Sequence, residues 1–170
     1  MPAPTRTSLI DVVSDDDRAV ATIERGEALK RGANFRTAHI FIVNERGDLL
    51  LQQLAEGRER HARRWGSSVA AYLHAGETYE EAAIRRLREE LGLSLALHSV
   101  GKIHMRDVNS LKFVSLFLGY DGEAAILEPD HIAGLAYWPI DKVDRALGTE
   151  LGRFTPTFRR LYEAFGKRLS

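Results

Sequence analysis

The chain has 170 residues, of which 44% are hydrophobic and 28% charged, and its 24 basic side chains balance 24 acidic ones. This length and composition are typical of one globular domain with a sizeable core. The zero formal charge argues against a nucleic-acid polymer as a partner, because such proteins usually carry a basic excess. The chain contains no cysteine, which excludes disulfides, thiolate metal sites and cysteine nucleophiles.

No apolar run approaches the roughly 20 residues that span a bilayer, and the first residues lack the apolar segment of a signal peptide. We therefore expect a cytoplasmic protein with no membrane partner. No repeat, low-complexity tract or linker divides the chain. We expect a single domain over residues 1–170, with an N-terminal hairpin extension over 1–31 and a core over 32–170.

In the first half of the chain, short β-branched and apolar runs alternate with turn residues, a pattern typical of strands. The predicted elements are, in chain order, a hairpin of strands 8–13 and 19–23 around the acidic turn 14–17, a short helix 24–31, a buried strand 36–44, a strand 49–54 and a charged surface loop 55–64.

The second half combines strands with helical periodicity. Its predicted elements are a strand 65–73, a helix 79–91, strands 95–105, 111–120 and 135–138, and helices 140–147 and 155–169. Mixed strands with one central and one terminal helix predict an α/β fold of the α/β/α sandwich type.

The central helix has clear boundary signals. Thr78 and Glu81 have the spacing of a capping box, which typically contributes about 1 kcal/mol. Gly92 is suited to the left-handed turn that follows a helix. The apolar side is predicted to comprise Ala83, Ile84, Leu87 and Leu91, and the charged side Arg85, Arg86, Glu89 and Glu90.

Two interpretations of the charged side remain open. It could be a solvated face with i,i+4 ion pairs, each contributing only about 0.2–0.5 kcal/mol. Alternatively, Glu77 in the preceding loop could join Glu89 and Glu90 in one concavity. Carboxylate oxygens are the ligands that Mg²⁺ and Mn²⁺ prefer, so the second interpretation indicates a metal site.

The stretch from residue 71 to residue 93 resembles the Nudix box, G-x5-E-x7-R-E-U-x-E-E-x-G-U, where U is a bulky aliphatic residue. The residues that agree with this pattern are Glu77, Arg85, Leu87, Glu89, Glu90, Gly92 and Leu93. Two positions depart from it. Ala71 replaces the opening glycine, and Arg86 replaces the glutamate that follows the box arginine.

The resemblance extends beyond the box. The segment 65–69 (WGSSV) is similar to the W-D-x-S-V of Nudix proteins related to isopentenyl-diphosphate isomerase. A hairpin like 9–23 and a Trp-Pro element like residues 138–139 also occur in that subgroup. The resemblance implies a Nudix-type α/β/α sandwich with a mixed β-sheet and an N-terminal β-hairpin. It does not imply isomerase activity, because the cysteine of that chemistry has no counterpart here.

The resemblance implies hydrolysis of a diphosphate linked to a second group X, supported by divalent metal. Carried over by position, Glu89 and Glu90 become the metal ligands for Mg²⁺ (or Mn²⁺). Arg85 would orient Glu77 or a neighbouring carboxylate. Glu77, Arg85, Glu89 and Glu90 are thus the expected catalytic residues.

Arg86 stands where a carboxylate ligand or general base is expected. A positive charge there should weaken metal binding, and losing a general base commonly costs about 10²–10⁴ in rate. Its fork of donors could instead bind a substrate phosphate. Outside the box, the residues that could compensate are Glu56, Glu59, Asp107, Glu123, Glu128, Asp130 and His131.

Two hypotheses follow for the function. The first is a Mg²⁺-dependent hydrolase of a nucleoside diphosphate derivative or a similar small diphosphate. The second is a protein of the same fold that binds a ligand or partner without turnover. The sequence does not identify the substrate. The exposed strands of the N-terminal hairpin could pair with a second copy, so a homodimer is one alternative to a monomer.

Overall fold

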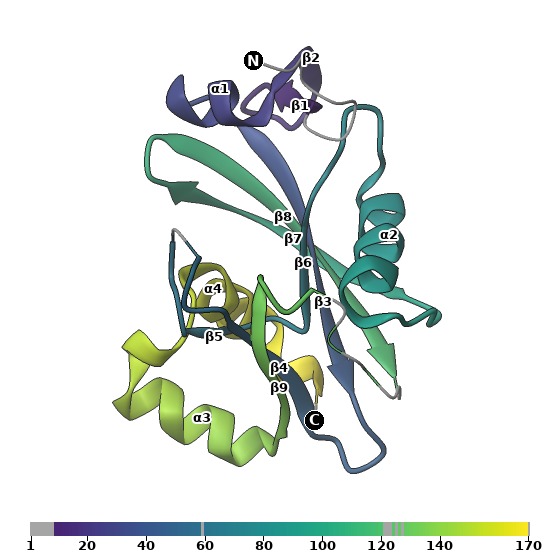
Figure 1. Cartoon of the computed structure of the whole chain (residues 1–170), viewed down its shortest axis with the longest axis vertical. Helices are drawn as coiled ribbons and strands as arrows, with labels where there is room; N and C mark the ends of the chain where they lie inside the picture. The colour runs from purple at the N-terminus through teal and green to yellow at the C-terminus, as the bar shows by residue number, and fades with distance from the viewer. Residues whose placement is uncertain (1–8, 59, 121–123, 125, 127, 170) are drawn as a thin grey trace.

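The computed structural model describes residues 9–58, 60–120, 124, 126 and 128–169 (Figure 1). Within these residues the strands are β1 (Leu9–Val13), β2 (Ala19–Glu24), β3 (Phe35–Val43), β4 (Leu49–Leu54), β5 (Trp65–Gly66), β6 (Val69–Tyr72), β7 (His98–Asp107), β8 (Ser110–Tyr120) and β9 (Ile132–Trp138). The α-helices are α1 (Arg25–Lys30), α2 (Tyr79–Leu91), α3 (Ile140–Thr149) and α4 (Pro156–Phe165). Short 3-10 turns cover Leu151–Arg153 and Gly166–Leu169.

The described strands form one seven-stranded sheet and one separate hairpin. The large sheet has the order β5-β4-β3-β8-β7, with β6 paired to β3 and β9 paired to β4. β3 and β8 run parallel, and the other pairs are antiparallel. This arrangement confirms the predicted α/β fold with a mixed sheet and an N-terminal hairpin.

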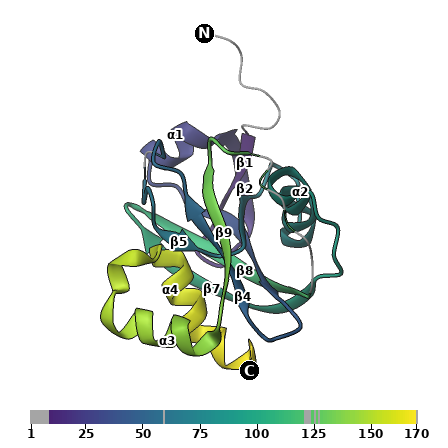
Figure 2. The same ribbon diagram turned by 60° about the horizontal axis from the view of Figure 1, so that its bottom comes forward.

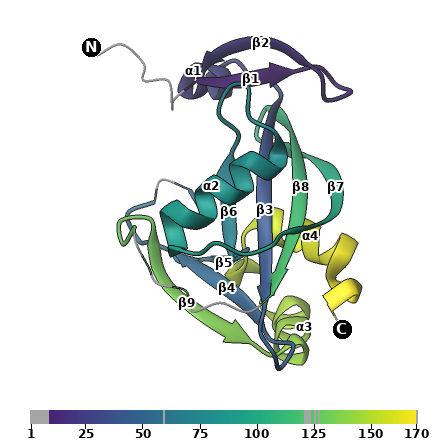
Figure 3. The same cartoon turned by 90° about the vertical axis from the view of Figure 1, so that its right-hand side faces the viewer.

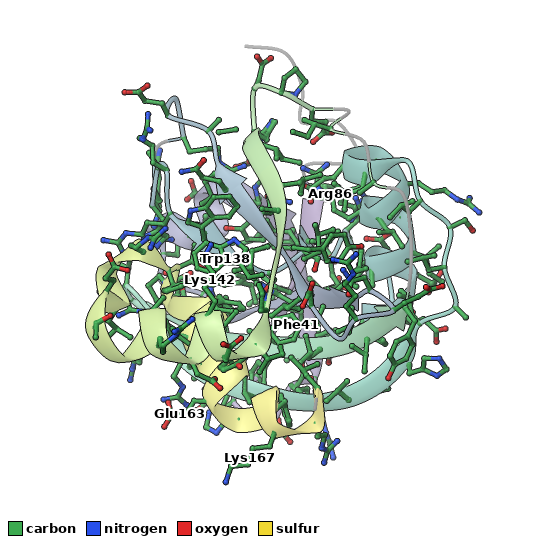
Figure 4. All side chains as sticks on the ribbon, turned by 90° about the horizontal axis from the view of Figure 1, so that it is seen from below. Phe41, Arg86, Trp138, Lys142, Glu163 and Lys167 are labelled. Atoms are coloured by element: carbon green, nitrogen blue, oxygen red, sulfur yellow. The ribbon has the colours of Figure 1, made fainter. Side chains whose placement is uncertain are left out.

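Helices cover both faces of the large sheet, and the side chains of β3 alternate between them. α2 lies on one face, while α3 and α4 lie on the other (Figures 2 and 3). Ile40 and Ile42 belong to the core beneath α2, and Phe41 and Val43 belong to the core beneath α3 and α4. Successive residues of a strand point to opposite faces, so β3 contributes to both cores. Figure 4 shows Arg86 on the α2 side and Trp138 beside α3.

α2 begins and ends where its sequence predicts. Thr78 Oγ1 accepts a hydrogen bond from the backbone of Glu81, whose carboxylate accepts one from the backbone of Thr78, and Gly92 has a φ of 66°. The buried side differs from the prediction at three positions, the first being Ala82, which is buried although it was not assigned to the apolar side. Ile84 is 38% exposed, and Glu90 is only 3% exposed. The sheet is covered by Ala82, Ala83, Leu87 and Leu91, so the contact face is rotated away from Ile84 and toward Glu90.

The predicted strand 65–73 is divided in two, which the sequence pattern did not indicate. Its first part pairs with β4 and its second with β3. β3 and β4 separate from one another, since their only registered pair is Val43 with Leu49. Ser68 spans the gap: its hydroxyl donates to the carbonyl of Leu50 (2.6 Å) and accepts from the backbone N–H of Ile42 (2.9 Å). A side chain therefore satisfies backbone groups that no strand reaches.

The hairpin of β1 and β2 lies at one end of the molecule, next to α1 (Figure 1). Val20 on β2 is 63% exposed, and pairing of this hairpin in a homodimer stays a prediction. No helix within the described part of the chain is long and apolar enough to cross a membrane. The single-domain division into 1–31 and 32–170 also stays a prediction.

Ser68 offers a test of how the divided strand is stabilised. Ser68→Ala should lower the free energy of unfolding by about 1–3 kcal/mol, because two backbone groups buried beside it would lose their partner. Urea denaturation followed by circular dichroism would measure the change. The exposed Ser94→Ala variant is the control and should stay within about 0.5 kcal/mol of the parent. Equal losses in the two variants would contradict the role assigned to Ser68.

Candidate active site

A cavity of about 770 Å³ lies between α2, β3, β6 and the start of α4. This volume is in the usual range for small-molecule sites. We distinguish two groups of its lining residues, called the carboxylate end and the lysine end after their charged members. The carboxylate end comprises Gln52, Arg85, Arg86, Glu89, Glu90 and Glu128, and the lysine end comprises Thr37, His39, Ser67, Lys112 and Thr157.

Arg85 holds two carboxylates of the site, those of Glu77 and Glu89, in place. Its Nε and Nη2 donate to the two oxygens of Glu77 at 2.8 and 3.0 Å, and its Nη1 donates to the carboxylate of Glu89 at 3.2 and 3.3 Å. Nη2 also donates to the carbonyl of Tyr72 at 2.9 Å. The resemblance to the Nudix box implies that Arg85 orients Glu77 or a neighbouring carboxylate, and in the structure it binds both Glu77 and Glu89. Glu77 itself is not among the residues lining this cavity, because it binds the far side of Arg85.

These contacts also set the charge of the carboxylates. Burial alone would raise the pKa of Glu77, but hydrogen bonds from Arg85 and from the backbone of His74 hold that pKa below its usual value. Burial likewise opposes ionisation of Glu89, and hydrogen bonds from Arg86 and Arg85 outweigh it and lower the pKa. Both groups are therefore ionised near neutral pH.

Arg86 lies at the centre of three carboxylates. Its Nη1 donates to Glu89 Oε2 at 2.9 Å and to Glu128 Oε1 at 3.0 Å. Its Nη2 is 2.8 Å from Glu128 Oε2, and its Nε is 3.3 Å from Glu90 Oε1. Glu128 comes from the segment before β9, so Arg86 joins that segment to α2. The guanidinium thus occupies the point on which the acidic side chains converge.

Glu90 differs from its neighbours because it is almost completely buried. Burial raises the pKa of Glu90 to about 7, and the nearby charge of Arg86 only partly offsets this effect. The amide of Gln52 donates to Glu90 Oε2 at 3.3 Å. Near neutral pH, Glu90 is therefore present in both the neutral and the ionised form.

The carboxylate end does not fit a divalent ion in this arrangement. Glu89, Glu90 and Glu128, the described acidic side chains at the convergence point, all bind Arg86. Among the residues that the structure describes, no three His, Asp or Glu side chains are placed so that they could hold one metal ion. A divalent ion at Glu89 and Glu90 would require Arg86 to move away.

The other predicted acids lie in different places. Glu128 is brought to the carboxylate end, and His131 lines the cavity with its Nδ1 2.8 Å from Arg58 Nη1. Asp107 lies near the lysine end. Glu56 and Asp130 are exposed and do not line the cavity, and Glu59 and Glu123 lie outside the described residues.

Sequence reasoning missed the lysine end. His39 and Lys112 stand within apolar strand sequences, and this placement was the only available signal. His39 Nδ1 is 2.7 Å from Ser67 Oγ, and Lys112 Nζ donates to Thr157 Oγ1 at 2.6 Å. Thr157 is held in place because α4 begins against β5, where the backbone N–H of Thr155 donates to the carbonyl of Trp65 at 2.8 Å.

Positive charge predominates in the cavity as a whole. The described lining includes seven cationic side chains, Arg25, Arg58, Arg60, Arg85, Arg86, Arg106 and Lys112, against four carboxylates, Glu89, Glu90, Asp107 and Glu128. Low-dielectric walls strengthen the resulting field, so the cavity favours anionic ligands.

A model of the NUDIX domain matches residues 33–162, which is most of the chain. The chain therefore belongs to the Nudix family. It is 27% identical over 153 residues to an isopentenyl-diphosphate Delta-isomerase from Pectobacterium atrosepticum, covering 87% of this chain and 86% of that protein.

Solved structures agree on the fold. A crystal structure of a Deinococcus radiodurans protein superposes with a TM-score of 0.70 at 22% identity, covering 84% of this chain and 90% of that one. The Nudix domain of NrtR from Shewanella oneidensis, solved with ADP-ribose, gives a TM-score of 0.63 at 15% identity, covering 87% of this chain and 100% of that one. Family and relatives together indicate an enzyme that acts on a diphosphate compound, by hydrolysis or isomerisation, in groups that generally use divalent metals.

His39 makes the stability of the fold depend on pH. Burial, with a contribution from the charge of Lys112, lowers the pKa of His39 to about 3. The unfolded chain protonates this residue near its ordinary pKa of about 6.5, so the folded state binds fewer protons between these values and loses stability as the pH falls. Between pH 7 and pH 5 this single residue should cost about 2 kcal/mol.

Urea denaturation at the two pH values would test this. In the His39→Gln variant, which cannot titrate, the loss between pH 7 and pH 5 should be smaller than in the parent by about that amount. Equal pH dependence in the two proteins would show that His39 has the same pKa in the folded and in the unfolded chain.

Proposed function

We propose that this chain hydrolyses the diphosphate bond of a nucleoside diphosphate derivative or a similar small diphosphate bound in the cavity. One observation carries the proposal: box residues Arg85, Arg86, Glu89 and Glu90 line a single cavity of nucleotide size whose described lining is predominantly cationic. The solved relative with ADP-ribose supports it, because a similar fold accommodates a nucleoside diphosphate sugar.

In this proposal the arginines bind and neutralise the diphosphate, and a water molecule attacks phosphorus. The bridging P–O bond breaks, the leaving oxygen departs with the bond electrons, and a carboxylate accepts the proton of the water. Glu89, Glu90 and Glu128 all lie around Arg86 and are the candidates for that base. Hydrolysis is favoured over isomerisation because the chain has no cysteine to perform the isomerase chemistry.

The contacts of Arg86 oppose the binding of Mg²⁺ or Mn²⁺ at Glu89 and Glu90 in this arrangement. Arg86 holds the two predicted ligands, Glu89 and Glu90, and Glu128 beside them. We therefore expect slow turnover compared with Nudix proteins that have glutamate at this position. A second candidate function, ligand binding without turnover, is favoured by the same contacts.

The Arg86→Glu variant separates these functions. Phosphate release would be measured for the parent and the variant with a panel of nucleoside diphosphate derivatives and triphosphates, in EDTA and with Mg²⁺ or Mn²⁺. If the protein is an impaired hydrolase, the variant should gain metal-dependent activity, up to about 10²-fold, because a carboxylate returns to the metal and base position.

Arg88→Glu is the matched control, since it makes the same charge change on an exposed position of the same helix and should leave the rate unchanged. Lower activity in Arg86→Glu would mean that Arg86 itself acts on the substrate. No release from any compound by either folded protein, together with binding detected by calorimetry, would favour the second candidate.

A further inference from the structure

The lysine end of the cavity contains polar side chains for which the proposed hydrolysis has no use. Thr37, His39, Ser67, Lys112 and Thr157 are each less than one tenth exposed. Burying such groups destabilises a fold unless each finds a partner. Their concentration in the wall of a ligand-sized cavity therefore calls for a chemical explanation.

The hydrogen bonds at this end leave donors available. Lys112 Nζ donates to Thr157 Oγ1 at 2.6 Å and is 3.3 Å from Asp107 Oδ2. An ammonium group has three N–H donors, so these two contacts leave one for a ligand. Thr157 accepts the bond from Lys112, which leaves its own hydroxyl hydrogen to donate. A ligand here must supply acceptor oxygens.

The charge at the lysine end also favours a ligand with acceptor oxygens. Asp107 is shared by Lys112 and by Arg60, whose Nη2 is 2.5 Å from Asp107 Oδ1. Lys112 therefore shares this carboxylate, which compensates its charge only in part. His39 adds no negative charge, since burial keeps its ring neutral near pH 7 by lowering its pKa. The ammonium of Lys112 can therefore pair with an anionic group on a ligand.

We propose that the lysine end binds an anionic oxygen group, a phosphate or a carboxylate, carried by the part of the ligand attached to the diphosphate. The preferred ligands are then diphosphates that bear a second anionic group. This inference rests on the proposed function, which places the diphosphate at the carboxylate end. A hydrocarbon group such as isopentenyl would leave the donors of Lys112 and Thr157 unpaired, and a site built for hydrogen bonding rejects such a ligand strongly.

Calorimetry with matched ligand pairs tests the inference. ADP-ribose would be compared with ADP-ribose 2′-phosphate, and UDP-glucose with UDP-glucuronate, in EDTA and with Mg²⁺. The members of each pair differ by a phosphate or a carboxylate only, so the two pairs also distinguish these sources of charge. The anionic member of at least one pair should bind about 10- to 100-fold tighter, as expected for a hydrogen bond to a charged group. Equal affinity within both pairs would overturn the inference.

A substitution of Lys112 tests whether this residue causes the preference for the anionic ligand. Lys112→Met should remove the advantage of the anionic ligand, while the affinity for inorganic pyrophosphate stays within about threefold of the parent. Lys102→Met is the matched control, because Lys102 lies outside the cavity in a contact with Asp17 and should keep the full preference. Retention of the preference in Lys112→Met would contradict the inference. Thr157→Val, a smaller change at the same place, should reduce the preference if Lys112→Met fails to fold.

The outcomes also separate this inference from the proposed function. Binding of pyrophosphate without any preference within the pairs would overturn the lysine-end site alone. If no diphosphate bound, the diphosphate site would be absent, and both the proposed function and the lysine-end inference would be overturned.

Discussion

The guanidinium of Arg85 binds three parts of the chain: Glu77 in the loop before α2, Glu89 on α2, and the carbonyl of Tyr72 at the end of β6. The loop, the helix and the strand are therefore fixed relative to one another by one planar group with several donors. Removing it would leave Glu77 half-buried without its counter-charge, a more expensive situation than losing an exposed ion pair. The other contacts of the carboxylate end are built on this arrangement, since α2 must be held against β6 for its next residue to face the cavity.

That next residue is Arg86, and it places a positive charge where the family pattern has a negative one. A guanidinium offsets part of the charge of the three carboxylates around it, through hydrogen bonds to Glu89 and Glu128 and an ion pair with Glu90. The family frame is thus retained, while the charge at its centre has changed sign relative to the family pattern. The retained frame agrees with the match to the NUDIX domain, and the expectation of slow hydrolysis follows from the changed charge.

The sequence predicted those features that depend on local interactions. The limits of α2 were predictable because Thr78, Glu81 and Gly92 act within a few residues of themselves. The division between β5 and β6 was not, because it depends on the separation of β3 from β4, which only the assembled sheet determines. The lysine end was missed for the same reason. His39 and Lys112 come from strands far apart in the sequence, and a buried charged residue within an apolar run gives no indication of the residue that it meets.

The parallel pairing of β3 with β8 also determines how late this site can form. Residues 35–43 align with residues 112–120 over the whole length of β3. A parallel pair cannot be closed by a short turn, so most of the intervening chain must be ordered or looped out before the two strands meet. Contacts of such long range are associated with slow folding. The lysine end belongs to this late step, because His39 lies on β3 and Lys112 on β8. A ligand bound there would recognise only the chain in which these two strands have paired, and it would stabilise that folded state.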